Sequence, residues 1–377
     1  MKKAIALILC VSCLGMALAG CGSKPATEEP KKEEATTEAT TETDADVDAP
    51  AKESDIVIGF STGSSGSSFR TILENNFKEV ADSYKEQGII KDYKIVNNVT
   101  NKDAAEQANI IRDFINDSEI NVIMLNPNSA TDLNGVLSEA VEAGKTVVVL
   151  DCEVDVEGVT CVSINHYEWS KKAGEYIANV LQEGNAVQIY GGEGHPANNE
   201  RIRATDDVLA DYPDINLVAS TTGGWNQQQA KEVATQLLSS GTEIDAIFTQ
   251  DSMGAGILSA AMDLDKVPKV MFGECGTEYV NMAKELFDQG KPFEFCTQPN
   301  PPGISATALH IAVNLAQGKE FKPDVLGGLR GATYYYEVTS WFTDKDLDEL
   351  VEIFKDEPDD YLLTEYLTQE EAAALFQ

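Results

Sequence analysis

Short runs of Val, Ile and Leu alternate with helical patterns from residue 55 to about residue 316. A run that is apolar throughout indicates a strand covered on both faces, as in parallel sheets. The expected strands are residues 56–60, 93–96, 121–125, 146–150, 158–162, 186–190, 215–219, 244–248, 269–272 and 293–296. Helical patterns of about 10–20 residues between strands are typical of βαβ units. An alternation of this length predicts an α/β protein with two doubly wound parallel-sheet domains.

The N-terminus has a different composition and resembles a bacterial lipoprotein signal. Two lysines precede an almost wholly apolar segment, which ends in Leu18-Ala19-Gly20-Cys21. The resemblance implies a signal peptide over residues 1–20, cleavage before Cys21 and a diacylglyceryl thioether on its sulfur. The alternative is an ordinary secretory signal followed by an incidental cysteine. The acidic, aromatic-free residues 21–53 favour the first interpretation, because they predict a disordered tether that leads from a lipidated cysteine.

The formal net charge of −35 restricts the partners of this chain. Removal of residues 1–20 takes away two lysines and no acid, which leaves about −37. Nucleic acid is therefore excluded, because its phosphates require Lys and Arg patches. Adhesion to anionic lipid heads is excluded for the same reason, so we expect the two acyl chains to hold the protein at the membrane. We expect a monomer outside the cytoplasm, with a ligand that is neutral or recognised by local contacts. The lipid anchor favours a Gram-positive-type surface, and the periplasm of a Gram-negative cell is the alternative.

Four cysteines remain after the signal and the lipidated residue are set aside. The pairs Cys152–Cys161 and Cys275–Cys296 each join neighbouring strand ends. Four buried free thiols are the alternative, and we slightly favour them, because four cysteines in a chain of this length are not a disulfide scaffold.

Polar and aromatic residues gather directly after the predicted strands. In doubly wound sheets, ligands bind beyond the carboxyl ends of the strands. The residues found there are aromatic rings and planar carboxylate, amide and guanidinium groups. A polyhydroxylated ring needs this combination, since rings cover its C–H faces and planar groups bridge adjacent hydroxyls. For each residue alone, a helix cap is the simpler interpretation.

Residues 55–320 resemble the type I periplasmic binding proteins, in particular the ribose/galactose-type solute receptors of ABC importers. The resemblance is carried by Ile58-Gly59-Phe60-Ser61, Leu125-Asn126-Pro127, Gln250-Asp251-Ser252-Met253-Gly254 and Gln298-Pro299-Asn300, in that order. It implies a sugar or related polyol as the ligand, and a permease and ATPase complex as the partner.

Family positions imply a set of ligand-binding residues. The principal ones are Phe69, Arg70, Asp151, Arg201, Trp225, Asp251 and Gln298. A second group comprises Ser61, Asn126, His195, Asn199, Asn226, Glu274 and Asn300. The chain departs from the family at Cys152, at Glu274-Cys275-Gly276 and in the long 191–199 loop, so the identity of the sugar stays open.

The resemblance also implies hinge closure between two lobes joined by three strands, with crossings near Asn165, near Gln298 and around residues 323–335. The expected N-terminal lobe is 54–164 plus about 299–323, the C-terminal lobe is 165–298 plus about 324–345, and 346–377 is a helical extension.

An enzyme would need a nucleophile with a base, or a metal cluster. The three histidines lack metal-ligand spacing, and the G-x-S-x-G elbow is absent. We therefore expect binding without catalysis, with no cofactor and no metal. A receptor that passes a sugar signal to a membrane partner is the alternative, and a secreted carbohydrate-active enzyme is less favoured.

Overall fold

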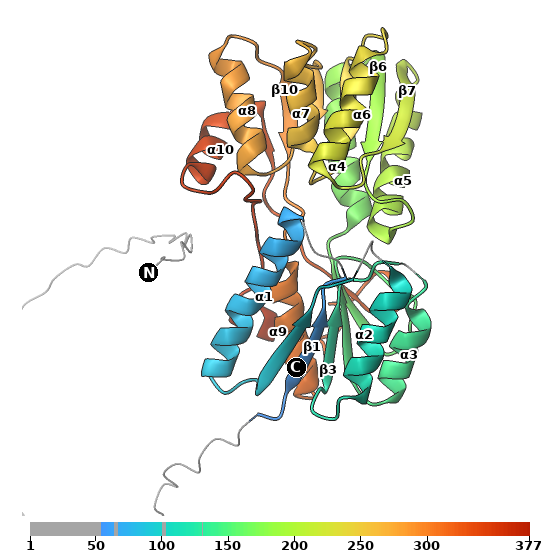
Figure 1. The fold of residues 1–377 in the computed structure, drawn as a ribbon, viewed down its shortest axis with the longest axis vertical. Coiled ribbons are helices and arrows are strands. Elements are labelled where there is room, and N and C mark those ends of the chain that lie inside the picture. Colours follow the sequence, from blue (N-terminus) through green and yellow to red (C-terminus); the bar gives the residue numbers. More distant parts are fainter. Residues whose placement is uncertain (1–53, 64–66, 100–102, 130) are drawn as a thin grey trace, which may run out of the picture. The chain divides into compact units, whose positions relative to one another are not determined.

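The structure is a computed structural model that describes residues 54–63, 67–99, 103–129 and 131–377. The predicted signal peptide, Cys21 and the predicted tether lie outside the described residues. The described chain contains two six-stranded sheets, each covered by helices on both faces, and we call the two sheet-and-helix layers the first and second lobe (Figure 1).

The first lobe is built on a fully parallel sheet in the order β11-β5-β4-β3-β1-β2. Its strands are β1 (Val57–Ser61), β2 (Asp92–Val96), β3 (Val122–Leu125), β4 (Thr146–Leu150), β5 (Val159–Ser163) and β11 (Thr333–Tyr335). Its helices are α1 (Ser68–Glu86), α2 (Ala104–Asn116), α3 (Asn134–Glu142), α9 (Ile304–Ala316) and α11 (Gln369–Ala373).

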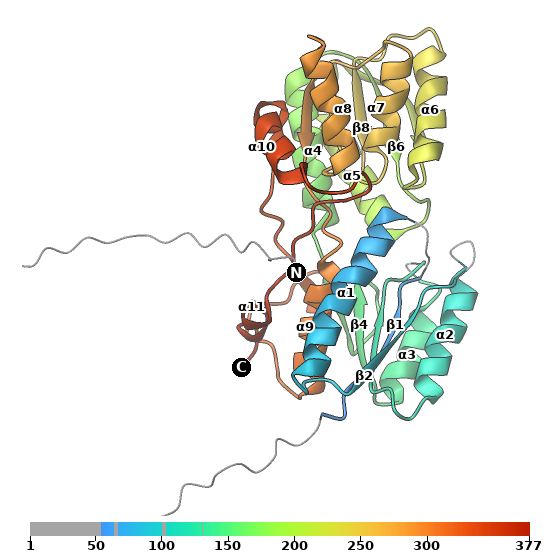
Figure 2. The same cartoon turned by 60° about the vertical axis from the view of Figure 1, so that its left-hand side comes forward.

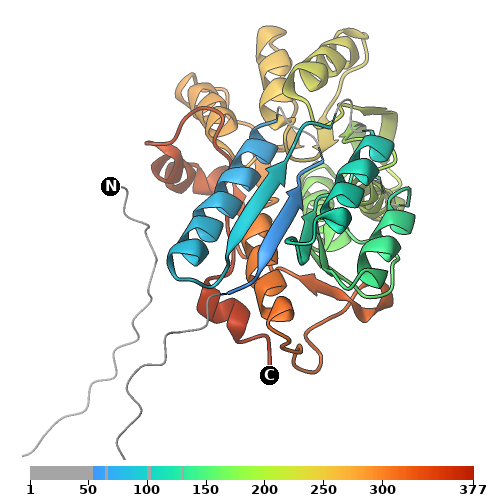
Figure 3. The ribbon, with the colours of Figure 1, turned by 60° about the horizontal axis from the view of Figure 1, so that its bottom comes forward.

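Alternating strand residues divide the first lobe into two cores. Ile58 and Phe60 face the helices α1 and α9, whereas Val57 faces α2 and α3. The same alternation holds along β4, where Val148 and Val149 belong to opposite cores. Figure 3 shows helices on both sides of this sheet. Apolar side chains on both faces explain why these strands read as continuous apolar runs.

The second lobe repeats the same strand order, β12-β10-β9-β8-β6-β7. Its strands are β6 (Gly184–Tyr190), β7 (Ile215–Thr222), β8 (Ala246–Thr249), β9 (Val270–Phe272), β10 (Glu294–Thr297) and β12 (Phe342–Thr343). Its helices are α4 (His166–Leu181), α5 (Pro196–Ala210), α6 (Gln227–Ser239), α7 (Gly254–Asp263), α8 (Thr277–Asp288) and α10 (Leu347–Phe354). The edge strand β12 runs antiparallel to β10. The prediction of two doubly wound parallel-sheet lobes is confirmed.

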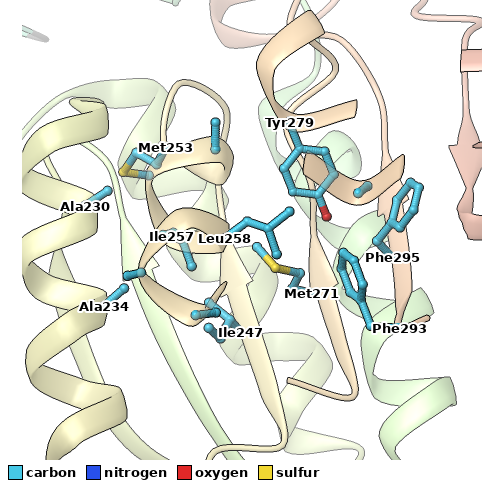
Figure 4. Close-up of a cluster of buried hydrophobic side chains, with 14 of the residues drawn as sticks. Ala230, Ala234, Ile247, Met253, Ile257, Leu258, Met271, Tyr279, Phe293 and Phe295 are labelled. Carbon is cyan, nitrogen blue, oxygen red and sulfur yellow. The ribbon is translucent and has the colours of Figure 1, made fainter. Parts of the chain in front are cut away.

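Helices α6, α7, α8 and α10 cover one face of the second sheet, and α4 and α5 cover the other. In the first of these cores, Met271 and Phe295 from the sheet lie near Leu258 and Tyr279 from the helices (Figure 4). The rings of Tyr279 and Phe295 meet edge to face with centroids 5.7 Å apart. This packing makes the second sheet a rigid base for the loops at its strand ends.

The chain passes between the lobes four times. The first two crossings lie where we expected them, between β5 and α4 and between β10 and α9. The third lies between β11 and β12, after the predicted residues 323–335. The expected boundary of the second lobe near residue 324 was wrong, because Thr333–Tyr335 pairs with β5 of the first sheet.

The C-terminal residues make the fourth crossing. Helix α10 packs in the second lobe and α11 packs beside α9 in the first (Figure 2). Between them, Leu363 N donates to Cys275 O at 2.9 Å in the second lobe. The next residue, Thr364, accepts a 2.8 Å hydrogen bond from Gly303 N at the start of α9. The expected helical extension 346–377 is therefore divided between the lobes.

All four cysteines of the described chain are free and buried, as the favoured interpretation expected. The described helices include none that is long and apolar enough to span a bilayer.

Candidate functional site

A cavity of about 620 Å³ lies between the lobes, beyond the carboxyl ends of the strands in both sheets. Side chains from both lobes line it. Nine of the predicted residues do so: Phe69, Arg70, Asp151, His195, Arg201, Trp225, Asn226, Asp251 and Asn300. The rule that ligands bind beyond the carboxyl ends of the strands, which we call the strand-end rule, therefore located the cavity.

Phe69 and Arg70 reach the cavity from the first turn of α1. The helix begins there because the Ser67 hydroxyl caps it and accepts a hydrogen bond from Arg70 N. Phe69 is buried, and the Arg70 guanidinium lies 5.9 Å from the centre of its ring. The buried Nη1 of Arg70 has no hydrogen-bond partner among the described residues. Burial lowers the pKa of Arg70, and the nearby Asp151 opposes that shift.

Asp151 follows β4 directly and adopts a left-handed backbone, with φ of 67°. This conformation is uncommon for a residue with a side chain and marks strain at the strand end. One carboxylate oxygen accepts a 3.2 Å hydrogen bond from Asn126 Nδ2. Burial raises the pKa of Asp151, while Arg70 and Arg201 lower it. The carboxylate is thus influenced by one cation from each lobe.

Arg201, from α5 of the second lobe, is the most deeply buried cation of the cavity, with 1% of its surface exposed. Its guanidinium lies 4.3 Å from the centre of the Trp169 ring and forms an ion pair with Asp251. The second oxygen of Asp251 accepts from Asn300 Nδ2 at 3.3 Å. A buried, paired and stacked arginine presents a fixed array of donors to the cavity.

Trp225 follows β7 and has a φ of 53°. Its Nε1 donates to Gln250 Oε1 at 2.9 Å. The rings of Trp225 and His195 meet edge to face, with centroids 4.9 Å apart. A Cβ at Gly191 would come within 2.1 Å of the Trp225 ring, so glycine is required for this close approach. The ring is therefore held against the Gly191 backbone at one wall of the cavity.

Two of the predicted residues that line the cavity also cap helices. The Asn226 side chain accepts from Gln229 N at the start of α6, and the His195 ring accepts from Ala197 N at the start of α5. Capping, the simpler interpretation of polar residues after strands, therefore applies to these two as well.

Five predicted residues do not line the cavity. Ser61 and Asn126 are buried behind it, where Ser61 accepts from Gln107. Gln298 donates to Trp169 O at 2.6 Å and lines a separate cavity of about 280 Å³ at the crossings. Asn199 is an exposed residue of α5.

The fifth, Glu274, is turned into the second lobe. It accepts a hydrogen bond from Gln227, and only 3% of its surface is exposed. Burial raises its pKa to about 7, although hydrogen bonds from Gln227 and from backbone N–H groups oppose that shift.

Sequence reasoning missed several lining residues. They include Ser67, Asn128, Glu193, Thr222, Gln229 and Ser252. Asn128, Thr222 and Ser252 lie within three residues of the ends of β3, β7 and β8, so the strand-end rule applied more broadly would have found them. His166, which contacts Arg201 from behind the cavity, gave no such signal, because it follows a lobe crossing.

Within the described residues, no group of three or more His, Cys, Asp or Glu side chains is arranged to hold a metal ion. The acidic run after β4 contacts the 327–333 loop instead, since Glu153 accepts from Leu329 N and Thr333, and Asp155 pairs with Arg330.

Comparison with known proteins points to one family. Residues 58–320 match the periplasmic binding protein domain. The D-allose-binding periplasmic protein of Escherichia coli is 26% identical over 257 residues, which cover 65% of this chain and 81% of that protein. The xylitol-binding protein of Mycolicibacterium smegmatis is 27% identical over 252 residues, which cover 66% of this chain and 70% of that protein.

Solved structures show the same fold. An ABC transporter solute-binding protein from Thermobispora bispora superposes with a TM-score of 0.72 at 23% identity, covering 85% of this chain and 94% of that one. A Bacillus halodurans solute-binding protein with bound myo-inositol superposes with a TM-score of 0.65 at 21% identity, covering 80% of this chain and 98% of that one.

Proposed function

The chain belongs to the periplasmic binding protein domain family, and we propose that it is the extracytoplasmic solute receptor of an ABC importer for a monosaccharide or related polyol. One observation carries the proposal. The cavity between the lobes is lined by aromatic rings and by planar charged groups from both lobes. Relatives named for D-allose, D-apiose and xylitol support a ligand of this class.

The chemistry of the lining suits a neutral, hydroxyl-rich ring. Phe69 and Trp225 come from opposite lobes and offer apolar faces to its C–H surfaces. Arg70 has a buried donor without a partner among the described residues, and the charges of Arg70 and Arg201 both act on the Asp151 carboxylate. Charge-assisted hydrogen bonds from such groups to hydroxyls are stronger than neutral ones. We assign these four residues, with Arg201 and Asp251, to ligand binding.

The proposed mechanism is closure of the lobes around the sugar. A ligand shifts a two-state equilibrium only by its differential affinity for the two states. A sugar that contacts Arg70 in the first lobe and Asp251 in the second makes both sets of contacts only when the lobes approach each other. The crossings between the lobes would act as the hinge.

We further propose that the protein is a lipid-anchored monomer without catalytic activity, tethered through Cys21 beside its permease and ATPase. Two acyl chains give stable anchoring. Tethering raises the concentration of the receptor near its importer, so that a released sugar is recaptured.

A thermal-shift screen of pentoses, hexoses and polyols, followed by calorimetric titration, tests the binding proposal. We expect at least one sugar to bind, and Trp225→Ala and Asp251→Ala each to weaken it by tenfold or more. Asn199→Ala is the matched control, because this exposed residue of α5 lies outside the cavity. Wild-type affinity in both cavity variants would refute the site, and conversion of the sugar to a product would refute the receptor.

The anchor needs a separate test. Full-length protein expressed in a bacterial host should partition into the detergent phase, and Cys21→Ala should move it to the aqueous phase. Detergent partitioning of Cys21→Ala equal to that of the wild type would contradict the proposal.

A further inference from the structure

The ring of His166 lies between the two lobes, at the first residue after the first crossing. Its Nε2 lies 2.8 Å from the carbonyl oxygen of Asp151 in the first lobe. Its Nδ1 lies 3.1 Å from Nη2 and 3.3 Å from Nε of Arg201 in the second lobe. The ring therefore contacts, on its two nitrogens, one charged residue of the cavity from each lobe. His166 itself is buried and lies behind the cavity wall.

These contacts assign the tautomer of the ring. A guanidinium can only donate hydrogen bonds, so Nδ1 must carry a lone pair. The proton of the neutral ring then lies on Nε2 and is donated to the Asp151 carbonyl oxygen. The Ser163 hydroxyl, 3.3 Å from Nε2, is a weaker neighbour on the same side. Only the neutral Nε2–H form satisfies both lobes at once.

Arg201 depends on this acceptor. The guanidinium lies over the Trp169 ring and pairs with Asp251 through Nη1, and its Nε and Nη2 both lie within hydrogen-bond distance of His166 Nδ1. A buried guanidinium that loses its acceptor bears a desolvation cost or turns away. We propose that His166 is a positioning residue: as a neutral Nε2–H tautomer it directs Arg201 into the sugar site and ties it to Asp151 across the hinge.

The expected effect of His166 on sugar affinity rests on the proposed function. The tautomer of His166 and its contact with Arg201 do not depend on that function. The lone pair on Nδ1 and the hydrogen bond at Arg201 Nε exist without any sugar. They are measured directly in the ligand-free protein, so a failure of the positioning role and a failure of sugar binding give different results.

Protonation of the ring would place a proton on Nδ1, opposite the Arg201 guanidinium. Burial lowers the pKa of His166 well below its usual value of 6.5, the charge of Arg201 adds to this, and His195 contributes in the same direction. The Asp151 backbone hydrogen bond opposes the shift. The facing titratable groups are thus Arg201, His195 and Asp151. Because the folded pKa is lowered, the neutral ring is fully present at neutral pH and is lost as the pH falls through the folded pKa.

The test compares His166→Gln with His166→Leu. A glutamine can donate through Nε2 to Asp151 and accept through Oε1 from Arg201, whereas leucine does neither. His310→Leu is the matched control, since His310 is equally buried but pairs with Tyr84 in the first lobe.

In the ligand-free protein, imidazole nitrogen NMR should show His166 protonated on Nε2 and not on Nδ1 at pH 7.5. Hydrogen exchange at Arg201 Nε should accelerate at least tenfold in His166→Leu and return toward the wild-type rate in His166→Gln. A proton on Nδ1, or unchanged exchange in His166→Leu, would overturn the inference, whether or not a sugar binds.

The binding arm uses the tightest ligand from a panel of D-allose, D-ribose, xylitol and myo-inositol. We expect His166→Leu to lose tenfold or more in affinity and His166→Gln to retain most of it. As the pH falls, wild-type affinity should drop more steeply than that of His166→Gln, which has no ring to protonate. Equal pH profiles, or wild-type affinity in His166→Leu, would contradict the positioning role.

Discussion

The two lobes have the same strand order, but they use equivalent strand ends differently. Strands β4 and β9 hold the same place in their sheets, and each is followed by an acid. Asp151 follows β4 directly, in a left-handed conformation, and lines the cavity. Glu274 follows β9 after Gly273 and turns into the lobe to accept from Gln227. Topology therefore places an acid at the rim, and the backbone just after the strand decides which way it points.

The two arginines of the cavity differ in the same way. Arg201 is paired with Asp251 and stacked on Trp169. Arg70 has a buried Nη1 without a partner among the described residues. We infer that the second lobe presents a preformed half of the site, while the first lobe keeps a donor available for the ligand.

The largest expected effect is a difference in stability between variants of these two arginines. Arg201→Met should lower the free energy of unfolding by about 3 kcal/mol, because it leaves the Asp251 carboxylate without its buried partner. Arg70→Met should change it by less than about 1 kcal/mol, because the buried Nη1 of Arg70 has no partner among the described residues. Both should weaken sugar binding. Urea denaturation and calorimetric titration measure the two quantities, and equal losses of stability would remove the distinction between the lobes.

Glu274 and Asp151 should differ in their effects on stability and on sugar binding, and the first effect should depend on pH. The pKa of Glu274 is raised to about 7, so the native state holds a proton that the unfolded state releases above its ordinary pKa of 4.5. Stability should therefore fall as the pH rises between these values, by at most about 1.4 kcal/mol per pH unit.

Glu274→Gln should flatten this slope between pH 5 and 7 without abolishing sugar binding. Asp151→Asn should instead lose affinity, because it removes a carboxylate that lines the cavity. Denaturation curves at several pH values check the first expectation and titration checks the second. A slope that persists in Glu274→Gln would show that another group produces it.

The wall formed by Trp225 should be sensitive to neighbouring glycines of the second lobe. Gly191→Ala should weaken sugar binding about tenfold, because its Cβ would come within 2.1 Å of the Trp225 ring. Gly192→Ala is the matched control, since its Cβ would lie 3.2 Å from that ring. Calorimetric titration of both variants with the sugar tests this expectation. An equal loss of affinity in the two variants would mean that Gly191 does not set the position of the Trp225 ring.

The smallest effect concerns the helices of the C-terminal residues. Thr368 forms a capping box with Glu371 in front of α11, which packs on the first lobe. Thr343 forms the equivalent box with Asp346 in the second lobe. Each Thr→Ala change should cost about 1 kcal/mol. Thermal unfolding measures both, and a drop of several kcal/mol at Thr368 alone would show that α11 stabilises the first lobe beyond its cap.

The sheets and most of the cavity followed from sequence because both depend on short-range patterns. Apolar runs predicted the buried strands, and the residues after them include Asp151, Trp225 and Asp251, which line the cavity. Ser61 ends β1 and Glu274 follows β9, but both point inward, because Gln107 and Gln227 are available there as partners. Such partners are distant in sequence, so no local sequence pattern predicts them.

The C-terminal path was harder to predict for a related reason. Thr333–Tyr335 is a short strand at a sheet edge, and its pairing with β5 joins residues about 170 positions apart. The sequence predicted a helical extension over residues 346–377, but the lobe on which α10 or α11 packs depends on contacts of Leu350 and Phe376 that only the folded chain defines.

The fourth crossing has a consequence for the order in which the protein is made. Strands β1 to β5 of the first lobe are synthesised first, yet α9, β11 and α11 of the same lobe arrive only with the last quarter of the chain. Until then the face of the first sheet that carries Ile58, Phe60 and Val148 lacks part of its cover. The lobe that begins folding first is thus completed last, and a chain that stops before α10 leaves both lobes unfinished and their apolar faces open to aggregation.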